Sequence, residues 1–67
     1  MDNIRDPRKD PWPGDVLKDE MGVHMVCRRE KKSVSFARPC WAEIYTISLV
    51  CWRVNTPPST EVLHVAD

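Results

Sequence analysis

Residues 22–37 of the chain read GVHMVCRREKKSVSFA. Side chains alternate in character along residues 22–29 and again along residues 33–37, with a charged link of three residues between the two runs. A period of two is typical of β-strands, and a short polar link between two such runs predicts a hairpin. This stretch therefore predicts a fold built from short antiparallel strands.

Three further strands are expected outside this hairpin. Residues 15–18 form a short first strand, which a turn containing Gly22 separates from the hairpin. Residues 44–52 are the strongest β segment because they are rich in Ile, Tyr, Thr, Val and Trp, and the alternative is that this stretch starts as a loop and ends as a strand. Residues 61–66 follow a proline-containing connection and form the last strand. No segment combines a 3.6-residue period with helix caps, so little helix is expected.

Five short strands predict an all-β fold, a small five-stranded antiparallel SH3-like barrel. The single barrel domain spans residues 15–67. Residues 1–14 form a proline-rich arm, either extended or wrapped as a loop, with Ile4 and Trp12 as its only large apolar anchors. A closed or nearly closed sheet is expected, because open edges in so small a sheet invite pairing with another chain. A chain of 67 residues is also a marginal size for stability, so a partner subunit would help.

Charge is balanced over the chain but uneven along it. Ten basic and ten acidic side chains give a net charge of zero, which argues against the overall basic character common in nucleic-acid-binding domains. Residues 21–38 nevertheless carry five basic groups and one acidic group. This local basic patch is either a solvated hairpin tip or a binding surface.

Several classes of function are disfavoured by the same arithmetic. The acidic N-terminus carries no secretory signal, and the longest mostly apolar stretch is too short to span a membrane. The chain has three cysteines, Cys27, Cys40 and Cys51. An odd number favours reduced, buried thiols in a cytoplasm over a set of disulfide bonds. No C-x-x-C pair is present, and His24 is expected at the surface, on the face of its strand opposite Cys27. Neither a metal nor a cofactor is therefore expected.

Catalysis is not expected either. None of the serines, nor His24 or His64, lies in a nucleophile motif, and a barrel this small has little room for a pocket. Aromatic rings stack on bases and guanidinium groups hold phosphates. The candidate ligand-binding residues are therefore the set Arg28, Arg29, Lys32, Arg38 and Trp41. The competing interpretation places Trp52 and Phe36 in the core and lets Trp12 pin the arm.

The string DPRKDPWPGDVL at residues 6–17 resembles the start of small proteins carried by bacteriophages and prophages, with the pattern D-P-R-x-D-P-x-P-G-D-V-L. EVLHVA at residues 61–66 resembles their ending, whereas the middle of the chain matches poorly. Members often have a second tryptophan after the pair corresponding to Trp52 and Arg53, and this chain has Val54, Asn55 and Thr56 instead. The resemblance implies a phage origin, and it carries over no catalytic residue.

These observations lead to one functional hypothesis and its alternatives. The chain is expected to be a non-enzymatic phage-encoded binding protein in the cytoplasm of a bacterial host. It would counter a bacterial defence system as a homo-oligomer, by sequestering a nucleotide second messenger or by binding a host defence protein. The alternatives are a nucleic-acid-binding accessory module on an SH3-like or KOW-like barrel, and a structural phage component.

Overall fold

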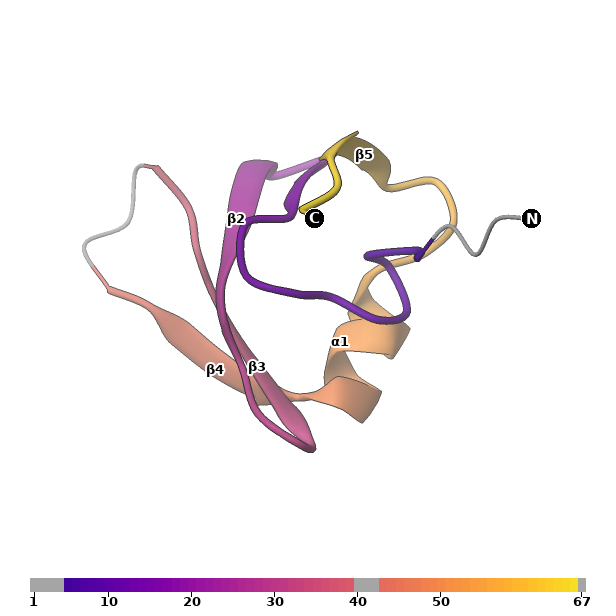
Figure 1. Cartoon of the computed structure of the whole chain (residues 1–67). Coiled ribbons are helices and arrows are strands. Elements are labelled where there is room, and N and C mark those ends of the chain that lie inside the picture. The colour runs from indigo at the N-terminus through magenta and orange to yellow at the C-terminus, as the bar shows by residue number, and fades with distance from the viewer. Residues whose placement is uncertain (1–4, 40–42, 67) are drawn as a thin grey trace.

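The computed structural model describes residues 5–39 and 43–66, and it consists of one antiparallel sheet and one short helix (Figure 1). The sheet has the strand order β4-β3-β2-β1-β5. The first four strands follow one another as a meander, and the chain then crosses through α1 to lay β5 beside β1. The elements are β1 (Val16–Asp19), β2 (Gly22–Arg29), β3 (Ser33–Ala37), β4 (Tyr45–Ser48), α1 (Leu49–Asn55) and β5 (Glu61–His64).

The prediction of a small all-β fold with five antiparallel strands is confirmed. The sheet curls into a barrel-like shape, but it is not closed: β4 and β5 are its two edges. Gly22 takes the positive φ of 113° that the turn between β1 and β2 requires, as its position in the sequence predicts.

The strand predicted over residues 44–52 is wrong in its second half. β4 ends at Ser48, which pairs with Ser33, the first residue of β3, so the chain has no neighbouring strand to follow further. The Ser48 hydroxyl instead accepts the Cys51 N–H at 3.1 Å and caps α1. The turn into a helix directs both Leu49 and Trp52 to the interior, which outweighs the β-propensity of the segment.

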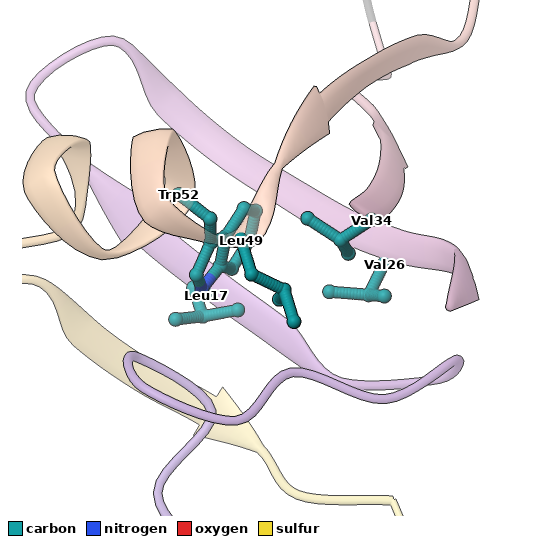
Figure 2. Packing of buried hydrophobic residues seen from close by; sticks show 5 residues of the cluster. All are labelled: Leu17, Val26, Val34, Leu49 and Trp52. Atoms are coloured by element: carbon teal, nitrogen blue, oxygen red, sulfur yellow. The ribbon is translucent and has the colours of Figure 1, made fainter. Parts of the chain in front are cut away.

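The core is small and centres on Trp52. Five buried hydrophobic side chains make it, with Phe36, Ile47 and Val62 packed around them: Leu17, Val26, Val34, Leu49 and Trp52 (Figure 2). The Trp52 ring also meets the rings of His24 and Phe36 edge to face, at centroid distances of 5.6 Å in each case. One helical residue thus contacts side chains from β2 and β3, and the interpretation that Trp52 and Phe36 are core residues is confirmed.

Strand β2 alternates as expected, but the prediction for His24 is wrong. His24 is buried rather than at the surface, since it lies on the same face as Val26. A bulge at Cys27 then shifts the register, so Arg29 rather than Arg28 lies opposite core residue Val34. The expectation of buried thiols is also wrong: Cys27 is half-buried and Cys51 is exposed, whereas Cys40 lies outside the described residues.

The described part of the arm wraps over the chain's own sheet. Pro7 and Pro11 are fully buried, and the Pro7 carbonyl accepts the indole N–H of Trp52 at 3.0 Å. Gly14 has a φ of 98° and donates its N–H to the Val26 carbonyl at 2.9 Å, which brings the arm onto β2. Figure 1 shows the arm passing beside α1 and the α1–β5 connection before it reaches β2.

The Trp52 indole is expected to contribute to stability through its N–H as well as through its size. Trp52→Phe removes the donor to the buried Pro7 carbonyl and should lower the free energy of unfolding by about 1–3 kcal/mol. Val54→Ala, at a residue of α1 that is 76% exposed, is the control and should change it by less than about 0.5 kcal/mol. Urea denaturation followed by circular dichroism measures both, and equal effects would contradict the role given to Trp52.

Candidate functional site

A buried carboxylate holds the N-terminal arm in place. Asp15 is fully buried and forms a two-pronged ion pair with the Arg5 guanidinium. It also accepts the N–H of Trp12 and the N–H of Ala66, each at 2.7 Å. Burial by itself would raise the pKa of Asp15, but these hydrogen bonds outweigh it and hold the pKa below its ordinary value.

Arg29, a predicted ligand residue, is part of the same arm-to-sheet contact. Its Nη1 donates to Asp10 Oδ1 at 2.6 Å and to the Pro11 carbonyl at 2.9 Å. Its guanidinium carbon lies 5.1 Å from the ring centroid of Trp12, which is 46% exposed. Trp12 therefore meets a strand residue, as the arm-pinning interpretation requires. The Nε of Arg29 also donates to the Glu30 carbonyl at 2.9 Å, so Arg29 is already engaged by four neighbours.

Arg38, another predicted ligand residue, is buried at the far end of β3. Its Nη2 donates to Asp19 Oδ2 at 3.0 Å, and its Nη1 donates to Asp19 Oδ1 and the Gly22 carbonyl at 3.2 Å each. The pair closes the turn between β1 and β2 over His24, whose Nδ1 lies 4.0 Å from Asp19 Oδ2. Burial, followed by the charge of Arg38, lowers the pKa of His24 below its ordinary value of 6.5.

The remaining predicted residues are divided between two places. Arg28 and Lys32 are exposed at the β2–β3 hairpin, where Arg28 forms an ion pair with Glu30 at 2.7 Å. Trp41 lies outside the described residues. The structure thus brings Arg28, Arg29 and Lys32 to one end of β3 and places Arg38 at the other, so the four described residues do not line a single surface.

A groove that the sequence did not single out lies between the arm, α1 and the α1–β5 connection. It has a volume of about 610 Å³ and is lined by Asp6, Arg8, Lys9, Asp10, Arg53, Thr56, Pro57 and Pro58. Residues 6–10 reach positions 53–58 only because the arm folds back, so no local motif marks the site. The one signal in the sequence was the pair Arg8 and Lys9 within the arm.

Two guanidinium groups of this groove are held by backbone carbonyls. Arg53 Nε donates to the Lys9 carbonyl at 2.8 Å, and Arg8 Nη1 donates to the Pro58 and Thr60 carbonyls at 2.9 and 3.0 Å. Among the described residues, the terminal nitrogens of Arg53 have no hydrogen-bond acceptor. A guanidinium fixed through its Nε presents its other donors in a set direction, which favours binding of an anion.

The aspartates of the groove have cationic partners of their own. Asp6 accepts the backbone N–H and the Nε of Arg8, both at 3.0 Å, and Asp10 pairs with Arg29. Within the described part of the chain, the charges of Lys9 and Arg53 have no ion-pair partner. The groove therefore presents two cations, Lys9 and Arg53, that form no direct ion pair with another described residue, next to the apolar rings of Pro57 and Pro58.

Other kinds of site were sought in the same residues. Within residues 5–39 and 43–66, no three His, Cys, Asp or Glu side chains lie close enough together to hold a metal ion. No helix in that part of the chain has the length and apolar character needed to cross a bilayer. A second groove of about 630 Å³ lies on the other side of Pro57, where acidic Asp19, Glu20 and Glu61 outnumber Lys18.

Comparisons with protein-family models, with curated proteins and with solved structures found no match to the chain.

The pKa shifts of the buried groups predict how stability depends on pH. His24 becomes protonated near pH 6.5 in the unfolded chain but only at lower pH in the folded chain. The free energy of unfolding should therefore fall as the pH drops below about 6.5. The pKa values of Asp15 and Asp19 lie below 3.8 in the folded state, so a second loss should follow below about pH 4.

Urea denaturation across this pH range measures both steps. His24→Gln should abolish the first decline and leave the second, whereas the control His64→Gln, at an exposed residue of β5, should leave both. A wild-type profile that is flat between pH 7.5 and 5 would contradict the burial of a neutral His24.

Proposed function

We propose that this chain is a non-enzymatic binding protein encoded by a bacteriophage, which counters a defence system in the cytoplasm of its bacterial host. It acts as a homo-oligomer and sequesters a phosphate-bearing nucleotide signal. The phage origin rests on the resemblance at residues 6–17 and 61–66. The observation that carries the choice of ligand is the groove in which Arg53 and Arg8 are held by backbone carbonyls.

The chemistry of the groove suits a nucleotide in three ways. The two terminal nitrogens of Arg53 lie in one plane and can donate to two oxygens of a phosphate, and Lys9 adds a second positive charge beside them. Pro57 and Pro58 supply apolar surface against which a sugar or base can pack. Arg29 and Arg38 already have carboxylate partners, so binding phosphate through them would require breaking internal ion pairs.

Titration calorimetry with cyclic dinucleotides, cyclic oligonucleotides and cyclic ADP-ribose-like molecules tests this proposal. The double variant Lys9→Ala with Arg53→Ala should weaken binding at least about tenfold, since a hydrogen bond to a charged group contributes about 1.5–3 kcal/mol. The matched control is Arg28→Ala with Lys32→Ala, which removes the same charge from the hairpin and should change the affinity by less than about twofold.

The opposite outcome has a clear meaning. Loss of binding only in the hairpin variant would move the site to the residues predicted from the sequence. No binding of any of these nucleotides by the wild-type chain, with none retained in its native mass spectrum after purification, would overturn the sequestering function.

The hairpin favours one alternative function, a nucleic-acid-binding module. Arg28, Lys31 and Lys32 are exposed together at the turn between β2 and β3. If they contact a phosphate backbone, the logarithm of the affinity should fall with the logarithm of salt concentration with a slope of about −2 to −3.

Fluorescence anisotropy with single- and double-stranded oligonucleotides at several salt concentrations measures this slope. Arg28→Ala should reduce it by about one, and Lys18→Ala, which removes an exposed cation from β1, should leave it unchanged. Affinity that is insensitive to salt would exclude this alternative.

A further inference from the structure

The two edges of the sheet are protected to very different degrees. An edge strand exposes unpaired N–H and C=O groups, and proteins commonly guard such strands with charged side chains, prolines or bulges. Strand β5 has several of these features. A bulge interrupts its pairing with β1, Glu61 begins it, and Pro57 and Pro58 precede it. Beyond its end, the Ala66 carbonyl accepts Arg5 Nη2 at 2.7 Å.

The four residues of β4 carry none of these features, and the nearest charged residue before them is Glu43. They pair with β3 in unbroken register, and β3 is the only neighbour of β4 among the described strands. Residues 44–52 contain no charged residue and no proline. Ile44 is 62% exposed and Val50 is 69% exposed, so apolar side chains flank the open strand at both ends.

We propose that the β4 edge pairs antiparallel with the β4 edge of a second copy of this chain, about a twofold axis. The argument for a second copy is symmetry: an antiparallel pair of identical strands is self-complementary, so one uncharged strand supplies both halves of the interface. The pairing joins two five-stranded sheets into one continuous sheet. This pairing is the interface of the homo-oligomer in the proposed function. The proposal depends on that function only in this respect.

The pleat of the strand limits the register of this pair. Tyr45 and Ile47 share the face that carries Phe36 and Val34, whereas Thr46 and Ser48 lie on the opposite face. Residues opposite one another must share a face, so the axis passes through Thr46 or through Ile47. In the first register Tyr45 lies opposite the partner's Ile47. Both registers bring the two copies of Thr46 within reach of each other, directly or diagonally.

The size of the interface also follows. A standard interface takes about 800 Å² from each partner, which is roughly a sixth of this chain's 4776 Å² surface. A four-residue strand alone offers less, so the flanking apolar residues Ile44 and Val50 are part of the proposed contact. None of the groove residues belongs to β4, and the groove therefore does not depend on this contact.

Light scattering after size-exclusion chromatography of the full chain, in a dilution series under reducing conditions, tests the proposal. The wild-type mass should be twice the chain mass of 7.8 kDa. Thr46→Lys and Thr46→Glu each place like charges across the axis and should raise the dissociation constant at least about tenfold. An equimolar mixture of the two variants should restore the dimer, which misfolded variants would not do.

Two controls separate charge from other effects. Thr46→Val loses the hydroxyl contact with Ser35 at 2.7 Å without adding charge, and it should remain dimeric. Leu63→Lys adds the same charge to the other edge, at a residue that is 46% exposed, and should also remain dimeric.

Three results would overturn the interface. These are a wild-type monomer at every concentration, a dimer that survives Thr46→Lys but not Leu63→Lys, and a mixture of the charged variants that stays monomeric. A wild-type monomer that still binds a nucleotide would overturn the interface alone. A dimer that binds none would leave the interface in place and overturn the sequestering function.

Discussion

The structure depends on one buried carboxylate, that of Asp15. Its two oxygens accept hydrogen bonds from Arg5 and Trp12 in the arm and from Ala66 near the end of the chain. Backbone groups of Asp15 and Gly14 also bond to Val26 of β2. A single charged group thus joins segments separated by as many as 61 residues. Removal of Arg5 would leave the buried carboxylate without its cationic partner.

This arrangement decides how the arginines of the chain are used. Arg5, Arg29 and Arg38 each hold a carboxylate and a backbone carbonyl, so they work as internal clamps rather than as surface charges. A guanidinium has five donors in a fixed plane and can join two chain segments at once, which suits a domain whose apolar core is small. The described cations left for a ligand are therefore Lys18 of β1 and those of the hairpin and of the groove under the arm.

The arm also changes what so short a chain can offer a partner. Because residues 5–14 fold back onto α1 and β2, they complete a groove that the sheet and helix would not form by themselves. Among the described strands, β4 has only β3 as a neighbour, and its four residues carry no charge. The two proposals therefore concern separate surfaces, and each surface can be altered without changing residues of the other.

Much of the fold was predictable from local patterns, because strands and tight turns are specified by nearby residues. The alternation along residues 22–37, the turn at Gly22 and the prolines of the arm correctly indicated short antiparallel strands and the absence of helix over residues 5–14. The start of α1 was not foreseen, because its residues favour strands. The helix begins where β4 reaches Ser33, the first residue of its partner strand β3, and has no further residue to pair with.

The roles of individual side chains were decided by the tertiary structure. The sequence marked Arg28, Arg29 and Arg38 as equivalent cations, but the bulge at Cys27 turns Arg29 toward the arm, and the turn between β1 and β2 brings Asp19 to Arg38. The groove joins positions 44 residues apart along the chain, as the bond from Arg53 to the Lys9 carbonyl shows. The alternation of side chains along a strand determines which residues can share a face. Contacts between distant segments determine which charges meet, because ion pairs depend on distance in space and not on separation in sequence.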